Sequence, residues 1–147
     1  AADRAAAEWS AAKMKALGFA NVQLEEFPLT AWVRGTERAE IVAPFAQPLA
    51  AVALGGAPPT GAKGVEGEVA MFGSYAELAA APRGSLEGKI AFISYRMTRT
   101  QDGSGYGAAG IGRRSGPAAA GERGALGFML RSLATGAARM PHTRATA

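Results

Sequence analysis

Side chains able to bind a small ligand gather in the segment 96–106. This segment holds two guanidinium groups, an amide, a carboxylate and a phenol, on Arg96, Arg99, Gln101, Asp102 and Tyr106. Recognition residues tend to lie on loops that a rigid scaffold carries, and the fork of an arginine suits a carboxylate ligand. The segment therefore predicts a ligand-contacting loop, with a solvated surface loop as the alternative.

A glycine-rich pattern follows directly. Residues 105–110 satisfy the G-x-G-x-x-G pattern of dinucleotide sites. Such a site needs these glycines directly after a strand and at the start of a helix, so that backbone N–H groups and the helix dipole meet the pyrophosphate. Here about ten residues separate the pattern from the strand expected to end at Tyr95, residues 111–116 are a poor helix opening, and Leu130 stands where an acid is needed. In a chain with 20 glycines the pattern is expected by chance, and nucleotide binding is a third-ranked hypothesis that titration with a dinucleotide would test.

Residues that hold metals or act as nucleophiles are scarce. The chain has no cysteine and one histidine, His142, in a Pro-His-Thr run. Structural zinc sites need four Cys or His ligands, and catalytic ones usually several His or carboxylate ligands. The G-x-S-x-G turn of serine hydrolases is also missing. The sequence therefore predicts no catalytic residue, metal site or cofactor site in this chain, and His142 by itself is typical of a surface or structural residue.

Composition narrows the class of protein. The 147 residues are 48% hydrophobic and 19% charged with a net charge of +4, which favours a folded domain over a disordered tail. The basic residues are dispersed, and only Arg113 and Arg114 are adjacent. Nucleic-acid binders concentrate positive charge on one face, so we expect no nucleic-acid partner. No apolar run approaches the roughly 20 residues that span a bilayer, so we expect no membrane partner.

The elements that must position these residues are short. A helix over 3–17 begins at Asp3 and ends at Gly18, and a strand-like alternation over 22–27 follows it. One helix and one strand cannot bury their own apolar faces. This piece is therefore expected to pack against a larger domain.

The remainder contains short β-leaning runs separated by glycine and proline turns. The expected strands are 31–34, 38–43, 49–54, 65–72, 89–95 and 125–130. A capping box of Ser74 and Glu77 predicts a helix over 75–81. A long loop over 98–116 is expected before a second short helix over 117–123. The pattern predicts an α/β, β-rich fold: a small β-sandwich or barrel flanked by short helices.

Short blocks spread over nearly the whole chain carry a family resemblance. In order they are Trp32–Ala39, Leu54–Gly56 with Pro58–Thr60, Glu77–Leu78, Gly88–Ile90, Arg114–Ala120, Gly124–Ala125, Leu130–Ser132 and Pro141–Thr143. Together they resemble the protease-associated domain of secreted zinc exopeptidases, the aminopeptidase and glutamate carboxypeptidase family. The last block is the most specific.

The resemblance implies a division after residue 31. Residues 32–147 would form the protease-associated domain, and residues 1–31 would begin the catalytic domain of the same polypeptide, whose zinc ligands lie in a later segment. The domain would cover or border the active-site cleft without catalysing, with the loop 96–106 and His142 facing peptide substrates. The implied partners are the catalytic domain, peptides and a second copy of the chain, in a secreted or periplasmic protein.

Separated from a catalytic domain, the amino-terminal piece is expected to expose apolar surface around Trp9, Leu17 and Phe27. The alternative function is a free-standing peptide- or protein-interaction module without a parent enzyme. A His-x-Asp metal motif encoded soon after Ala147 would decide for the exopeptidase.

Overall fold

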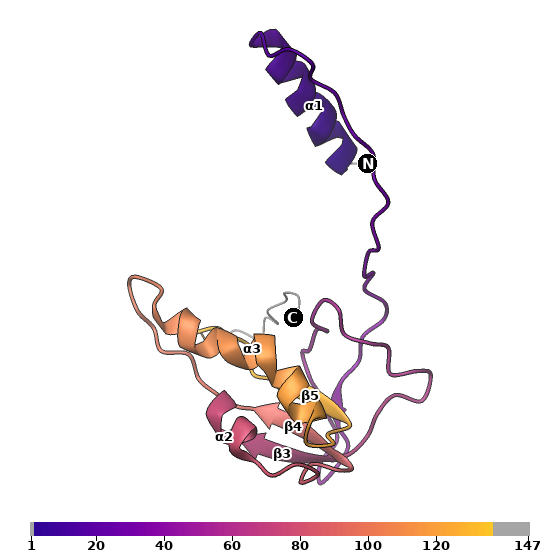
Figure 1. Ribbon diagram of the computed structural model, residues 1–147. Coiled ribbons are helices and arrows are strands. Elements are labelled where there is room, and N and C mark those ends of the chain that lie inside the picture. Colours follow the sequence, from indigo (N-terminus) through magenta and orange to yellow (C-terminus); the bar gives the residue numbers. More distant parts are fainter. Residues whose placement is uncertain (1, 137–147) are drawn as a thin grey trace. The chain divides into compact units, whose positions relative to one another are not determined.

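The computed structural model describes residues 2–136 (Figure 1). The chain divides into two compact units, Ala1–Ala31 and Trp32–Ala147. The assignment of the first to a catalytic domain and of the second to a protease-associated domain stays a prediction. In the described part of the chain, no helix has both the length and the apolar character needed to cross a membrane.

The first unit is built on α1, Ala2–Ala16, which confirms the expected helix. Asp3 in its first turn and Lys15 in its last turn suit the helix dipole, and Gly18 follows the helix with a φ of +88°. The strand expected over 22–27 is wrong, because those residues form no strand. Residues 2–31 contain no strand, so residues 22–27 have no strand of this unit to pair with.

Large apolar side chains of this unit are exposed, as expected from the sequence. The exposed fractions are 68% for Trp9, 67% for Leu17 and 74% for Phe27. Burying a side chain of this size stabilises a protein by about 1.5–3 kcal/mol. The first unit therefore leaves a substantial part of its apolar surface unburied.

The second unit is organised around a three-stranded parallel sheet. Its strands are β3 (Glu68–Phe72), β4 (Lys89–Ile93) and β5 (Gly127–Leu130), in the spatial order β3-β4-β5. Two helices make the crossovers, α2 (Tyr75–Ala80) between β3 and β4 and α3 (Gly105–Gly121) between β4 and β5. Crossovers between parallel strands are right-handed, so with this strand order both helices lie on the same face of the sheet, where they contact each other (Figure 1).

The core lies between the sheet and these two helices. Ala91 and Ile93 of β4 are buried there, in one cluster with Leu78 of α2. From α3 the cluster takes only the small side chains of Ala119 and Ala120. Small residues on the helix let it approach the sheet closely, and this contact positions α3 beside the carboxyl end of β4.

Helix α3 overturns the expected loop. The sequence predicts a loop over 98–116 and a short helix over 117–123, but one helix runs from Gly105 to Gly121. The prediction is wrong because packing overrides the weak helix propensity of glycine. A Cβ atom added at Gly116 would lie only 2.7 Å from Phe128 Cε2 of β5. Glycine here lets the helix approach the sheet, rather than breaking it into a loop.

Three of the expected strands and the helix expected over 75–81 are confirmed. Strands of four or five residues occur within three of the expected runs, 65–72, 89–95 and 125–130. The expected helix over 75–81 begins at its capping box, since Ser74 Oγ accepts from the Glu77 N–H at 3.2 Å. In return, Glu77 Oε2 accepts from the Gly73 N–H at 2.8 Å. These interactions span four residues or fewer, so the sequence predicts them well.

Strand content before residue 60 is lower than expected. β1 (Glu40–Ile41) and β2 (Gln47–Pro48) form a short antiparallel pair. The two residues of β1 are all that forms of the strand expected over 38–43. The strands expected over 31–34 and 49–54 are wrong, because those residues form no strand.

In residues 32–57, side chains form hydrogen bonds with backbone groups that would otherwise pair with a neighbouring strand. Glu37 Oε1 accepts from the Ala53 N–H at 2.9 Å and from Arg34 Nη1 at 2.5 Å. Trp32 Nε1 donates to the Ala57 carbonyl at 2.9 Å. Backbone groups satisfied in this way need no neighbouring strand. The α/β class is confirmed, and the β-sandwich or barrel stays a prediction.

Candidate functional site

Two hollows lie beside the chain that leads from β4 into α3. In open parallel sheets ligands bind outside the carboxyl ends of the strands, so this edge is where the fold favours a site. One hollow is bordered by the segment Met97–Thr100 and is called the loop hollow. The other lies between the start of α2 and α3 and is called the tyrosine hollow.

The loop hollow has a volume of about 200 Å³. Its lining combines hydroxyl, guanidinium and phenol groups with apolar atoms, from Met97, Thr98, Arg99, Thr100, Gly103, Tyr106 and Thr135. Arg99 is exposed and forms no ion pair with another residue of the described range. The hollow therefore presents hydrogen-bond donors and a positive charge to solvent.

The loop is held in shape by its own hydrogen bonds. Asp102 Oδ1 accepts from the Ser104 N–H at 3.0 Å, and Thr100 Oγ1 accepts from the Gly105 N–H at 3.2 Å. Gly103 has a φ of +76°, which glycine adopts without strain. The bond from the Ser104 backbone lowers the pKa of Asp102, because it favours the charged carboxylate. Asp102 thus stabilises the turn into α3.

Arg113 of α3 is joined to the loop hollow through Tyr106. Arg113 is only 3% exposed. Its Nη2 donates to Tyr106 Oη at 2.5 Å, and its guanidinium carbon lies 5.3 Å from the centre of the Tyr106 ring. The Nε atom of Arg113 is buried and has no hydrogen-bond partner among residues 2–136. Sequence reasoning missed this residue, because the spacing of seven pairs two side chains only once the segment is known to be a helix.

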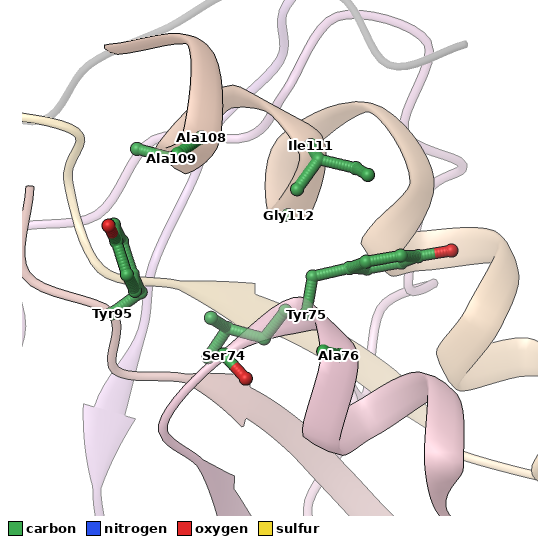
Figure 2. A pocket seen from close by; sticks show the side chains of 9 residues that line it. Ser74, Tyr75, Ala76, Tyr95, Ala108, Ala109, Ile111 and Gly112 are labelled. Carbon is green, nitrogen blue, oxygen red and sulfur yellow. The ribbon is translucent and has the colours of Figure 1, made fainter. Parts of the chain in front are cut away.

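The tyrosine hollow is larger and mostly apolar. Its volume is about 240 Å³. Figure 2 shows Tyr95, just after β4, and Tyr75 of α2 beside the α3 residues Ala108 and Ile111. The described residues that line it are Ser74, Tyr75, Ala76, Ile93, Tyr95, Ala108, Ala109, Ile111 and Gly112.

The G-x-G-x-x-G pattern does open a helix, contrary to the expectation from residues 111–116. Gly105 is the first residue of α3. The strand β4 nevertheless ends at Ile93, so a loop separates the strand from the glycines. A Cβ atom added at Gly105 would clash with the Thr98 carbonyl oxygen. Close packing of the chain therefore accounts for this glycine without a cofactor.

Comparison with known proteins relates the chain to peptidases. No model of a protein family matches it. It is 34% identical over 131 residues to carboxypeptidase Q of Bos taurus and 32% identical over 118 residues to carboxypeptidase Q of Rattus norvegicus, which covers 88% and 80% of this chain. The chain is homologous to a segment of carboxypeptidase Q. The crystal structure of a peptidase M28 precursor from Shewanella amazonensis SB2B matches 99% of the chain with a TM-score of 0.83 and 39% identity.

These matches cover only part of each relative. The chain spans 26% and 24% of the two carboxypeptidase Q proteins and 33% of the M28 precursor. The expected relationship to exopeptidases is confirmed at the level of a related domain.

The loop hollow gathers some of the predicted contact residues of this carboxypeptidase Q relative. Arg99 and Tyr106 both line it, whereas Asp102 bonds to the backbone of its own loop. The others are Arg96 and Gln101, which are exposed and line neither hollow, and His142, which lies outside the described residues. Contact of these side chains with a ligand stays a prediction.

The described residues do not fit a metal centre. Within residues 2–136, no three His, Cys, Asp or Glu side chains come together in a group that could hold a metal ion. The whole sequence has one histidine and no cysteine, whereas zinc sites in proteins draw mainly on these two residue types.

Proposed function

We propose that residues 32–147 are the protease-associated domain of a zinc exopeptidase, and that residues 1–31 belong to its catalytic domain. In this proposal the domain is not catalytic. It borders the active-site cleft and modulates the access of small peptides to it.

One observation carries the proposal. The chain is similar to carboxypeptidase Q over 88% of its own length but spans only 26% of that protein. A segment of this size, in which residues 2–136 bring together no group of three His, Cys, Asp or Glu side chains, suits an accessory role beside a catalytic domain. The unburied side chains of Trp9 and Phe27 support the same proposal, since a catalytic domain of the same polypeptide would bury them.

The remaining details extend this proposal. The zinc ion would be held by residues of the catalytic domain, and the protein would be secreted or periplasmic. The partners would be that catalytic domain, peptide substrates and a second copy of the chain. The β-sandwich or barrel of the protease-associated domain belongs to the same proposal.

Residues of the loop hollow are the ones proposed to meet the substrate. Arg99 offers an exposed guanidinium group on a loop whose shape is set by Asp102. A guanidinium group binds and orients a carboxylate without taking part in bond breaking. The expected contribution of Arg99 is therefore to substrate binding rather than to the chemical step.

Kinetics of two proteins test the proposal. The purified 147-residue chain, incubated with zinc and dipeptide or aminoacyl substrates, should show no turnover above the buffer rate.

In the full-length protein, Arg99→Ala should raise KM for small peptides and leave kcat unchanged, because it removes binding shared by ground state and transition state. The exposed residue Arg83, whose Nη2 lies 3.8 Å from Glu122 Oε2, provides the matched control Arg83→Ala. Robust zinc-dependent hydrolysis by the isolated chain would overturn the proposal.

A further inference from the structure

Two arginines are almost completely buried, and they differ in how their charge is satisfied. Arg123 is 8% exposed and Arg113 is 3% exposed. Arg123 donates to the carbonyl of Ala81 at 2.9 Å, to that of Ala119 at 2.7 Å and to that of Ala79. Its Nη1 also lies 3.5 Å from a Glu122 carboxylate oxygen. Arg123 is therefore a satisfied structural residue that joins the end of α2 to the end of α3.

Arg113 lacks such partners. Within the described residues, its only hydrogen bond goes to the phenol oxygen of Tyr106, and its Nε has no hydrogen-bond partner. No carboxylate of residues 2–136 forms an ion pair with it. The residues outside that range, Ala1 and 137–147, include no aspartate or glutamate. No acidic side chain of this chain therefore neutralises the buried charge, although buried charges are normally paired.

The charge of Arg113 is linked to the loop hollow. Tyr106 bonds to Arg113 and also lines the hollow. Arg99 adds a second guanidinium group to the same lining, and the amino end of the 17-residue helix α3 adds partial positive charge. Asp102 is the acid of this loop, but its carboxylate bonds to the Ser104 N–H and makes no ion pair with a described residue.

We infer that the loop hollow is an anion site that takes a carboxylate group, bound by Arg99 and favoured by the uncompensated charge of Arg113 acting through Tyr106. Arg113 is then a positioning residue, since Tyr106 and Arg99 line the hollow and Arg113 does not. The inference rests on the proposed function for one point, the peptide source of the carboxylate. A carboxylate from a peptide terminus and one from an acidic side chain share this chemistry.

Titration of the 147-residue chain with small probes tests the inference. The probes are acetylated dialanine, its C-terminal amide, acetylglutamate with both backbone ends blocked, and inorganic phosphate, in a buffer free of other carboxylates. Acetylated dialanine should bind with saturation, shift the NMR signals of the 97–106 backbone and weaken as salt is added, whereas its amide should not bind. If blocked acetylglutamate also binds, the hollow accepts carboxylates in general. If blocked acetylglutamate does not bind, the hollow is specific for the carboxylate of a peptide terminus.

Variants separate a binding role of Arg113 from a structural one. Arg113→Met should weaken acetylated dialanine about tenfold or more and leave the Tm unchanged or higher, because a buried charge without a partner is costly. Arg113→Lys should keep part of the affinity. The neighbouring exposed residue provides the matched control, Arg114→Met, which should change neither affinity nor Tm.

Three results would overturn the inference. The first is equal binding of acetylated dialanine and its C-terminal amide, and the second is binding of phosphate but of no carboxylate probe. The third is an Arg113→Met variant that binds acetylated dialanine as tightly as the parent chain but has a Tm several degrees lower. Each leaves the proposed function standing, because that proposal depends on turnover by the isolated chain and on KM of the full-length protein.

Discussion

Gly116 and Gly121 belong to the same helix but have different surroundings. A Cβ atom added at Gly116 would lie 2.7 Å from Phe128 Cε2, whereas one added at Gly121 would meet nothing within 4 Å. Phe128 packs against the core cluster, so it has little room to move. Only the first of these glycines is needed for the contact between α3 and the sheet.

Substituting the two glycines should therefore have opposite effects. Gly116→Ala should lower the free energy of unfolding by about 1–3 kcal/mol, since it overpacks the interface with Phe128. Gly121→Ala is the matched control and should raise it by up to about 1 kcal/mol, because alanine loses less backbone entropy on folding. Urea denaturation of the two variants measures both values. Equal destabilisation of the two variants would contradict the packing role of Gly116 against Phe128.

At the scale of elements, the turn into α3 depends on the charged form of Asp102. The Ser104 N–H bond lowers the pKa of Asp102 in the folded chain. As the pH falls, the unfolded chain takes up this proton first. The stabilisation is therefore fully present above the unfolded-state pKa, at about 4, and is lost as the pH falls through the lower folded-state pKa.

Asp102→Asn should remove this part of the pH dependence. The asparagine oxygen can still accept from the Ser104 N–H, so the turn should keep its shape while its titration disappears. The variant should show a smaller loss of stability than the parent chain as the pH falls below about 4, as measured by urea unfolding at each pH. The neighbouring change Gln101→Ala should leave the profile as it is. A profile of Asp102→Asn that matches the parent would contradict this role of the carboxylate.

At the scale of the whole molecule, the second unit holds a core of its own. The core cluster and the side chains packed on it come from residues 70–130 of this unit. The first unit contributes exposed apolar side chains such as Trp9 and Phe27. The second unit is therefore expected to fold without the first.

A chain reduced to residues 32–147 should unfold cooperatively with a Tm close to that of the parent. It should also associate less with itself, because large exposed apolar side chains are removed. Thermal melts followed by circular dichroism and size-exclusion chromatography measure the two effects. Leu78→Ala in the same short chain, which removes a fully buried side chain, should lower stability by about 2–5 kcal/mol. Absence of a cooperative melt in the short chain would show that residues 1–31 complete its core.

Much of the local structure could be predicted from the sequence, because its causes lie within a few residues. The capping box of Ser74 and Glu77 forms within one turn. The apolar run of β4 predicts a central strand, and Ala91 and Ile93 of this strand are buried. The scarcity of metal ligands was likewise set by residue types, since one histidine and no cysteine cannot make a zinc site of the usual kind. The grouping of polar residues in the loop 96–106 was visible in the same way.

Helix α3 and the loop hollow were decided by tertiary structure alone. Glycine is a weak helix former, so the glycine-rich residues 105–116 resemble a loop in the sequence. They are helical because α3 packs closely on the sheet, with Gly116 next to Phe128 of β5, a strand that comes later in the chain. The pairing of Tyr106 with Arg113 exists only on that helix, and it places a buried charge beside a loop whose residues were already candidates. Sequence determined which chemical groups this protein possesses, whereas packing between distant segments determined which of them meet, because the free energy that holds α3 comes from contacts that no local pattern encodes.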